Sequence, residues 1–318
     1  MNNFLDPAIL FFIFGAFAGL VKSNLEIPQP IARFLSLYLL MALGLKGGFA
    51  LQKSGFTLEI GLALGLAIFL ATLIPLIGYA ILRTRLNNYD SAAIAATYGS
   101  VSAVTFITAT QFLGQQGIAY GGHMAAAMAL MESPAIILAI LLANKARAAS
   151  TQKTASIGLS KILHESFTDG AQLLLLGSMA VGLLSGDDGQ RIMAPFSIDL
   201  FKGMLAFFLL DMGLMAAKNL GGIKGKPKIV LVYALLAPLL HAGLALLLCN
   251  LLGLPLGDTI LLMVLAASAS YIAVPAVLRH ALPEVNPGLY MGMSLGITFP
   301  FNIILGIPLY TFMAQWVR

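Results

Sequence analysis

Two short segments rich in hydroxyl groups carry the chemistry of this sequence. They are Tyr98–Thr105 (YGSVSAVT) and Ala267–Ile272 (ASASYI), and each lies in the middle of a long apolar run. In the hydrocarbon core of a bilayer, an interrupted helix leaves N–H and C=O groups without partners, which costs several kcal/mol for each group. Such breaks persist only where they are buried in protein or line a wet cavity. Two breaks at matching places in one chain predict the binding site of a secondary transporter.

The two breaks offer ligands for both an anion and a cation. Each second half-helix begins with free N–H groups and the positive end of the helix dipole, which favours an anion by about 0.3–2 kcal/mol. The first half-helices end nearby with free carbonyls, which suit a small cation. Neither segment contains Lys or Arg, so backbone N–H groups must hold the anion. The predicted substrate-binding residues are Gly99, Ser100, Val101, Ser102, Thr105, Ser268, Ala269, Ser270 and Tyr271.

Further oxygen ligands for a coupling Na+ or H+ lie in the fifth and tenth predicted helices. Glu132 sits near the middle of the fifth helix, and a carboxylate at the bilayer centre costs roughly 3 kcal/mol, so it should face a polar interior. Thr298 and Asn302 flank a proline at the related place in the tenth helix. The predicted sodium-binding residues are Ser102, Glu132, Ser270, Thr298 and Asn302.

Each of these groups also has a structural explanation. Ser, Gly and Ala are the small residues that let membrane helices pack closely, and a protonated Glu132 could bond carbonyls freed by Pro134. Lys46 is expected to extend to the outer surface, and Asp211 to form an interhelical or intersubunit hydrogen bond rather than act in transport. The four His residues lack ligand spacing, so no metal site is predicted, and no phosphate loop, dinucleotide fingerprint or ATPase motif occurs.

The composition identifies the elements that must position these residues. Of the 318 residues, 59% are hydrophobic and only 10% are charged, and the mean hydropathy is +0.92, which excludes an ordinary soluble globular protein. Basic residues in short loops explain the pI of about 9.3 better than nucleic-acid binding does. We predict an all-α membrane protein with ten transmembrane helices at 7–21, 30–51, 58–82, 91–112, 120–144, 167–185, 197–217, 229–252, 258–281 and 288–316.

An inverted repeat relates the two halves of the chain. Five predicted helices lie on each side of a polar linker, and an odd number turns the second half upside down relative to the first. Three pairs of segments match in order, each separated by about 170 residues. They are 40–51 with 209–220, 99–106 with 267–274, and 133–140 with 299–307. The discontinuous helices 4 and 9 are therefore expected to cross at the midplane.

The predicted organisation has three parts. Residues 1–145 form the first five-helix repeat, residues 146–166 a cytosolic linker, and residues 167–318 the second, inverted repeat. Most of the Lys and Arg residues face the cytosol only if both termini are extracytoplasmic, so the positive-inside rule predicts that orientation.

Several strings resemble the sodium-dependent bicarbonate transporter family across both halves of the chain. They are LGLKGGFAL (43–51), YGSVSAVTF (98–106), MESPAIILAILLA (131–143), DMGL (211–214) and SASYIAVPAVLR (268–279). The resemblance implies two inverted five-helix repeats, a homotrimer, and elevator-like motion of a core against a scaffold. The core would comprise helices 3–5 and 8–10, and the scaffold helices 1, 2, 6 and 7. It also places the substrate at Gly99–Thr105 and Ser268–Ser270.

Two features depart from that family. Cyanobacterial members carry an acidic residue in the ninth-helix break where this chain has Tyr271. This change predicts a difference from those members in ion stoichiometry or in substrate size. The linker is also short, so docking of a PII-like regulatory protein at the cytosolic face stays open.

These observations predict a sodium-coupled symporter of bicarbonate or a similar small anion in the bacterial plasma membrane. It would need no cofactor apart from Na+ as coupling ion, and it would not be an enzyme. Its expected partners are the anion, Na+, the lipid bilayer, further copies in a homotrimer and the PII-like regulator. The alternatives are a sodium- or proton-coupled transporter of a small carboxylate and a passive anion channel. An intramembrane enzyme that uses Glu132 is disfavoured, because no second acid, nucleophile or metal cluster lies at matching depth.

Overall fold

The computed structural model describes residues 6–55, 57–148, 170–223, 225–275, 278 and 284–317, and all regular secondary structure within them is helical. The first half contains α1 (Pro7–Leu20), α2 (Gln29–Ser54), α3 (Leu58–Leu82), α4 (Asn88–Gly99), α5 (Ala103–Gln115) and α6 (Met124–Ala148). The second half contains α8 (Gly170–Ala194), η2 (Pro195–Asp199), α9 (Phe201–Asn219), η3 (Leu220–Ile223), α10 (Lys228–Leu251), α11 (Leu256–Ala267), α13 (Pro287–Met293), η4 (Ser294–Thr298), α14 (Phe299–Phe301), η5 (Asn302–Gly306) and α15 (Ile307–Trp316). The prediction of an all-α protein is confirmed, and most of the predicted linker lies outside the described residues.

Polar residues fix the starts of several helices. Asp6 Oδ1 accepts a hydrogen bond from Ala8 N at 2.8 Å, and Pro7 occupies the first turn of α1, where a missing N–H has no cost. Thr57 caps α3 and Asn87 caps α4 through their side-chain oxygens in the same way. These caps define helix starts that the apolar runs alone predicted only to within a few residues.

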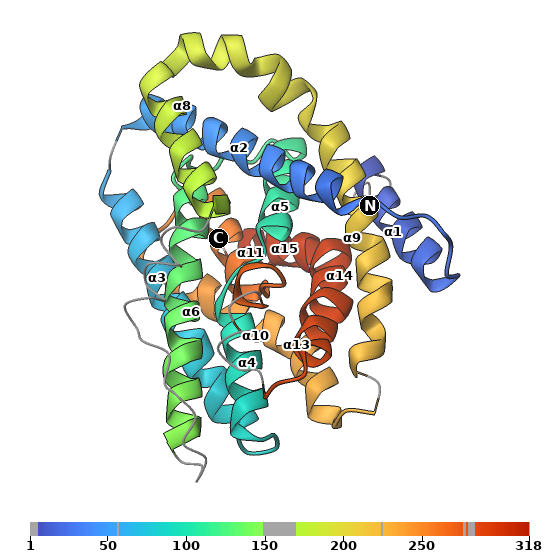
Figure 1. Ribbon diagram of the computed structural model, residues 1–318. Helices are drawn as coiled ribbons and strands as arrows, with labels where there is room; N and C mark the ends of the chain where they lie inside the picture. The colour runs from blue at the N-terminus through green and yellow to red at the C-terminus, as the bar shows by residue number, and fades with distance from the viewer. Residues whose placement is uncertain are drawn as a thin grey trace.

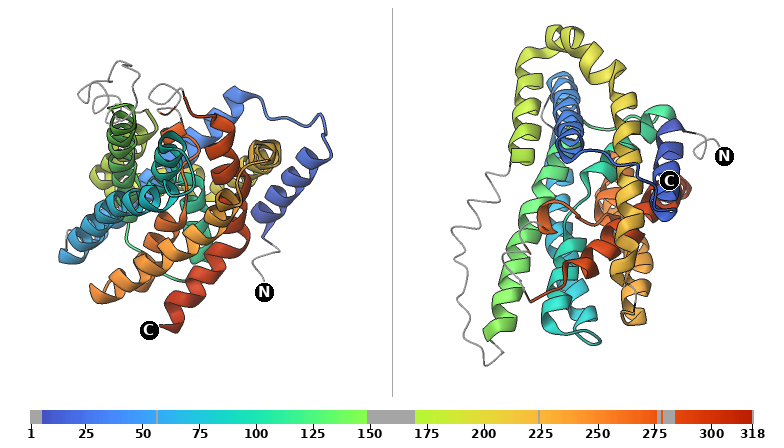
Figure 2. Two further views of the ribbon diagram at one scale, coloured as in Figure 1. Left: turned by 90° about the horizontal axis from the view of Figure 1, so that it is seen from below. Right: turned by 45° about the vertical axis from the view of Figure 1, so that its right-hand side comes forward.

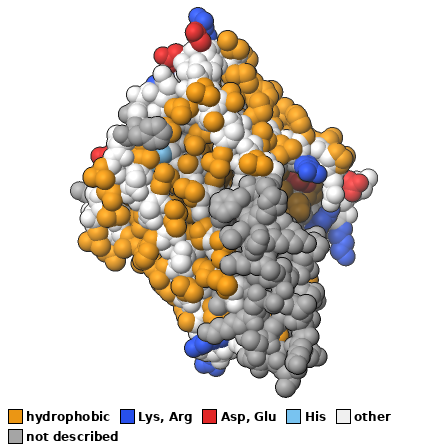
Figure 3. All heavy atoms as spheres, turned by 60° about the vertical axis from the view of Figure 1, so that its left-hand side comes forward, with side chains coloured by type: hydrophobic (Ala, Val, Ile, Leu, Met, Phe, Trp, Pro, Cys, Tyr) orange, Lys and Arg blue, Asp and Glu red, His pale blue; other side chains and the backbone are white. Residues whose placement is uncertain are grey.

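The outer surface is apolar over much of its area. Six helical stretches of the described chain are long and apolar enough to cross a membrane, among them Leu58–Leu82 and Lys228–Leu251. Large hydrophobic side chains stay exposed on them, including Leu240 at 68%. Figure 3 shows hydrophobic side chains across one face of the molecule, while charged side chains lie near its edges. The chain is therefore a multi-pass membrane protein.

Two pairs of helices pack through glycines. α1 packs along α9, and α2 packs along α8 (Figure 1). A Cβ added at Gly15 would lie 2.1 Å from the carbonyl oxygen of Leu210, and one added at Gly48 would lie 2.1 Å from that of Met179. Only glycine lets two backbones approach so closely, which is how many membrane helices associate.

α8 continues toward α9 without the loop that the sequence predicted between 185 and 197. The helix extends to Ala194 and joins α9 through η2. Gly186, with φ 55°, bends the helix where the predicted loop begins, and glycine adopts this φ without a steric cost. Figures 1 and 2 show this bent segment arching over one end of the molecule. The predicted loop between 185 and 197 is therefore reduced to a sharp turn at Gly186, and the residues that follow it are helical.

The remaining helices surround the interrupted ones. α3, α4 and α6 pack together, and α10 packs on α11. α5 and α15 both contact α11 near the centre of the molecule (Figure 1). This arrangement buries the end of α4, the start of α5 and the end of α11 far from the apolar outer surface.

We expect Gly48→Ala to destabilise the protein by about 1–3 kcal/mol, the usual cost of overpacking. The added methyl group would meet backbone atoms of Met179, Gly182 and Leu183, which cannot rotate away as a side chain can. Thermal unfolding in detergent micelles measures the loss. Gly65→Ala is the control, because a Cβ there meets nothing within 4 Å. Equal unfolding temperatures for the two variants would contradict the role of glycine in this contact.

Candidate functional site

The two hydroxyl-rich segments are breaks between helices, as predicted. α4 ends at Gly99, residues 100–102 are not helical, and α5 begins at Ala103. α11 ends at Ala267, residues 268–272 are not helical, and the chain becomes helical again at 273–275. Part of the predicted ninth helix beyond this point lies outside the described residues.

Hydrogen bonds join the two breaks directly. Ser102 N donates to Ser268 Oγ at 2.9 Å, and Ser270 N donates to Thr97 O at 2.8 Å. All four residues are at most 3% exposed. The structure therefore brings both predicted segments into one buried site, where α4 and α11 end and α5 begins.

A serine at the end of each break caps the helical turn that follows. Ser102 Oγ accepts hydrogen bonds from Thr105 N at 3.2 Å and from Thr105 Oγ1 at 2.8 Å. Ser270 Oγ accepts a hydrogen bond from Val274 N at 3.3 Å. The N–H group of Ala103 has no acceptor inside α5, and the helix dipole adds a partial positive charge there. The site can thus attract an anion without Lys or Arg.

Ser100 holds a hydroxyl group without a partner. Its Oγ is buried and has no hydrogen bond within the described part of the chain. Burying such a group costs about 1–3 kcal/mol, which a bound ligand would offset. Gly99 fits here because a Cβ would lie within 2.8 Å of the Pro75 ring. Val101 and Ala269 are also buried.

Tyr271 covers one side of the site. Its ring packs edge-to-face on Phe299, with the two ring centroids 5.4 Å apart. Its hydroxyl lies near Ser102 but makes no hydrogen bond of normal geometry with the described residues. Tyr271 also lines a cavity of about 640 Å³ that reaches Asp211 of α9.

Thr298 and Asn302 support the breaks from α13–α15. Thr298 Oγ1 donates to Ala234 O at 2.7 Å and lies 2.6 Å from the Tyr98 hydroxyl at the end of α4. Asn302 Nδ2 donates to the last carbonyl of α11 at 2.9 Å, and its Oδ1 accepts from the Tyr310 hydroxyl at 2.8 Å. Both side chains therefore hold the ends of the first half-helices in place.

The charged residues singled out by the sequence have other surroundings. Glu132 Oε2 accepts a hydrogen bond from Gln172 Nε2, which links α6 to α8, so this contact is separate from those that join the breaks. Lys46 Nζ lies 3.8 Å from the centre of the Phe201 ring on α9. Lys46 and Asp211 form no ion pair, in agreement with the expectation from an inverted repeat.

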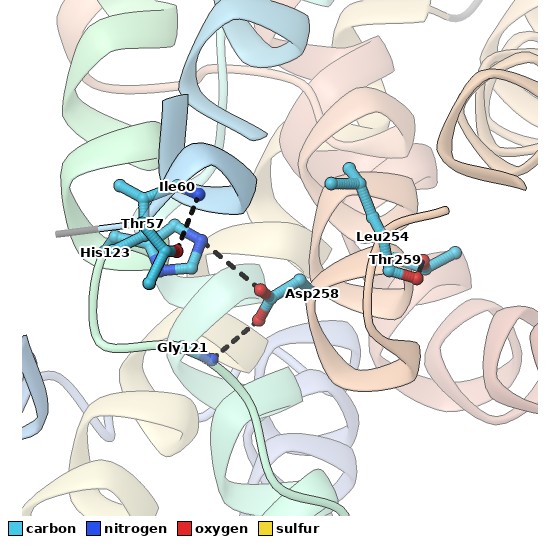
Figure 4. Close-up of polar contacts among 7 residues, drawn as sticks. All are labelled: Thr57, Ile60, Gly121, His123, Leu254, Asp258 and Thr259. Carbon is cyan, nitrogen blue, oxygen red and sulfur yellow. Dashed lines mark hydrogen bonds and ion pairs between the residues drawn. The ribbon is translucent and has the colours of Figure 1, made fainter. Parts of the chain in front are cut away.

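Sequence analysis missed a buried acidic residue that fastens the segment before α6. Asp258 Oδ1 accepts a hydrogen bond from Gly121 N at 2.6 Å, and its Oδ2 lies 3.3 Å from His123 Nε2 (Figure 4). Asp258 is 2% exposed and His123 is 5% exposed. The helix dipole stabilises an acid in the first turn of α11. The position of Asp258 at a helix start is the feature of the sequence that could have identified it.

Comparison with known families decides the class of protein. The sequence model of the Na+-dependent bicarbonate transporter superfamily matches residues 7–315, which is nearly the whole chain. The chain belongs to this superfamily. No curated protein matches it. Membership in the Na+-dependent bicarbonate transporter superfamily confirms the resemblance stated above, and it implies a transporter rather than an enzyme.

In this member of the superfamily, we expect Ser268→Ala to cost about 1–3 kcal/mol of stability, because Ser102 N–H then stays buried without its acceptor. Thermal unfolding in detergent micelles measures the change. Ser294→Ala is the matched control. Ser294 is equally buried and donates to Tyr290 O four residues earlier, as Ser268 donates to the nearby Leu265 O, but it does not join the breaks. Equal losses in the two variants would show that the link between the breaks adds no stability.

Proposed function

We propose that the protein is a sodium-coupled symporter of bicarbonate or a similar small anion that works by an elevator-like mechanism in the bacterial plasma membrane. The observation that carries this proposal is the pair of buried, hydrogen-bonded breaks, with Ser102 and Ser270 at the starts of the following helical turns. The superfamily supplies the substrate class. The positive-inside rule favours extracytoplasmic termini.

Helix packing supports two inverted five-helix repeats, residues 1–145 and 167–318. In such a repeat the first helix corresponds to the sixth and the second to the seventh. The packing of α1 on α9 then corresponds to the packing of α8 on α2. Glycines serve both contacts, since a Cβ at Gly15 of α1 or at Gly182 of α8 would lie within 2.6 Å of a carbonyl oxygen on the partner helix.

The anion would bind to helix ends and hydroxyl groups. Ser102 and Ser270 accept hydrogen bonds from the turns that they cap, which leaves their hydroxyl protons available to an anion. Ser100 adds a buried hydroxyl, and Ala103 adds a backbone N–H at the positive end of α5. These four donors can surround the oxygen atoms of bicarbonate, a small anion whose charge is spread over several oxygens.

The coupling Na+ would bind on the opposite ends of the same breaks. The last carbonyls of α4 and α11 lack partners inside their helices, and oxygen atoms are the ligands that hard cations prefer. Ser270 Oγ accepts one hydrogen bond and can supply a further oxygen, whereas both lone pairs of Ser102 Oγ already accept from Thr105. Thr298 and Asn302 are engaged with α4 and α11, so we assign them to positioning these carbonyls. Each bound ion raises the affinity for the other, and this coupling is reciprocal.

The boundary between the proposed core and scaffold is also built from glycines. A Cβ at Gly122, before α6, would lie 2.3 Å from Gly47 O of α2, and one at Gly222 of η3 would lie 2.0 Å from Gly288 O of α13. Contacts between bare backbones leave few side chains to interlock, which favours sliding of helices 3–5 and 8–10 against helices 1, 2, 6 and 7. A homotrimer and a PII-like regulator at the cytosolic face complete the proposal.

Uptake of labelled bicarbonate into proteoliposomes, with and without an imposed Na+ gradient, tests this function. We expect uptake above that of protein-free liposomes only with an inward Na+ gradient, because the cation is required to complete the site. Uptake of labelled acetate in place of bicarbonate would identify a carboxylate transporter. Equal uptake without Na+ would identify a passive channel, and either result would contradict the proposal.

Ser102→Ala and Ser270→Ala are each expected to lower bicarbonate uptake about tenfold or more, because a hydrogen bond to a charged group contributes about 1.5–3 kcal/mol. Gel filtration of the purified variants checks that folded protein is retained. Ser91→Ala is the control, because Ser91 is a buried serine of α4 that lies outside the breaks. Wild-type uptake by both site variants would refute their assignment.

A further inference from the structure

A cavity connects the second break with the side of α9. Its volume is about 640 Å³, and it lies between the first turns of α2, the middle of α9 and the break. A water molecule occupies about 30 Å³ of the liquid, so the cavity has room for many waters. Its polar side chains are those of Gln29, Arg33 and Ser36 from α2, Asp211 from α9, and Tyr271 from the break.

Asp211 is a buried acid in this cavity. The residue is 6% exposed, and its carboxylate makes no hydrogen bond and no ion pair with the other described residues. Lys218 of the same helix acts on it only electrostatically, and Arg33 lines the cavity with an exposed side chain. A charged carboxylate in the membrane interior is costly unless a cation or hydrogen bonds compensate it. The predicted interhelical hydrogen bond of Asp211 is not formed within the described chain.

A second polar group without a partner borders the same space. Tyr271 is 6% exposed, and its hydroxyl has no hydrogen bond within the described residues. The hydroxyl is close enough to Asp211 for the charge of the carboxylate to act on it, and it also lies near Ser102. A carboxylate oxygen and a phenolic oxygen therefore border the cavity next to the anion site, and neither makes a hydrogen bond of normal geometry with the described residues.

We propose that Asp211 and Tyr271 form a binding site for a monovalent cation, Na+, next to the anion site. Carboxylate and hydroxyl oxygens are suitable ligands for a hard cation, and one carboxylate balances one positive charge. Waters in the cavity would complete its coordination. The inference rests on the proposed function, since it names a ligand of the coupling ion that sequence analysis did not include.

The location of this site has a consequence for transport. Asp211 belongs to the proposed scaffold, whereas Tyr271 belongs to the proposed core. The two oxygens therefore face the same cation only while the core occupies the position seen here. A ligand shifts an equilibrium by its difference in affinity for the two states, so Na+ at this site stabilises this position of the core.

Asp211→Asn tests the site, because it removes the charge and keeps the shape. The first measurement is bicarbonate uptake as a function of Na+ concentration. The second is the rise in unfolding temperature of the purified protein on adding NaCl in place of choline chloride, which does not depend on transport. We expect the Na+ concentration for half-maximal uptake to rise about tenfold or more, and the stabilisation by Na+ to be largely lost. The KM for bicarbonate at saturating Na+ should change less than about twofold.

Asp199→Asn is the matched control, since Asp199 is an exposed acid at the end of η2 and should leave both measurements unchanged. Tyr271→Phe removes only the hydroxyl and should raise the half-maximal Na+ concentration about threefold. If Asp211→Asn does not fold, the Na+ dependence of Tyr271→Phe tests the cation site by itself. Wild-type Na+ dependence in the folded variants would overturn this site and leave symport intact. Uptake by the wild type that ignores Na+ would instead overturn the proposed function itself.

Discussion

The backbone N–H and C=O groups at the two helix breaks must form hydrogen bonds within the protein, because no bulk water reaches them. The rest of the structure depends on these hydrogen bonds. Each break provides hydrogen-bond partners for backbone groups of the other. The N–H of Ser102 binds Ser268 Oγ, and the N–H of Ser270 binds the Thr97 carbonyl. Neither interrupted helix would be tolerated alone in lipid, so the pairing of the breaks explains both their stability and their position at one site.

The surrounding helices keep this pairing in register. Asn302 bonds to the last carbonyl of α11, Thr298 lies within bonding distance of the Tyr98 hydroxyl near the end of α4, and Asp258 ties the start of α11 to the segment before α6. The glycine-mediated pairs α1–α9 and α2–α8 lie outside this group, and their close backbone contacts depend on neither break. The fold thus separates helices that hold the polar site from helices that pack mainly through backbone.

Sequence alone located the helices and the breaks because both are local properties. An apolar run of about 20 residues predicts a span, and Gly and Ser inside such a run predict its interruption. The partners of Asn302 and Asp258 could not be predicted, because a contact between distant residues leaves no mark in the local composition. The first residues after Gly186 are polar and were predicted as a loop, but the chain turns at this one glycine and is helical again directly after it. For Asp211 an interhelical or intersubunit hydrogen bond was expected, and within the described chain its carboxylate lies beside a cavity without an interhelical hydrogen bond.

The polar groups of the site do not all contribute equally to binding a solute. Ser102 N–H already has an acceptor in Ser268 Oγ, so an anion that takes this donor must first break an existing bond and gains only the difference. The Ser100 hydroxyl has no hydrogen-bond partner among the described residues, so an anion that binds it breaks no protein contact. The dipole of α5 also acts on an anion without the loss of a protein contact. Affinity should therefore come mainly from groups that the fold leaves unsatisfied. The groups that satisfy one another fix the distance between the breaks.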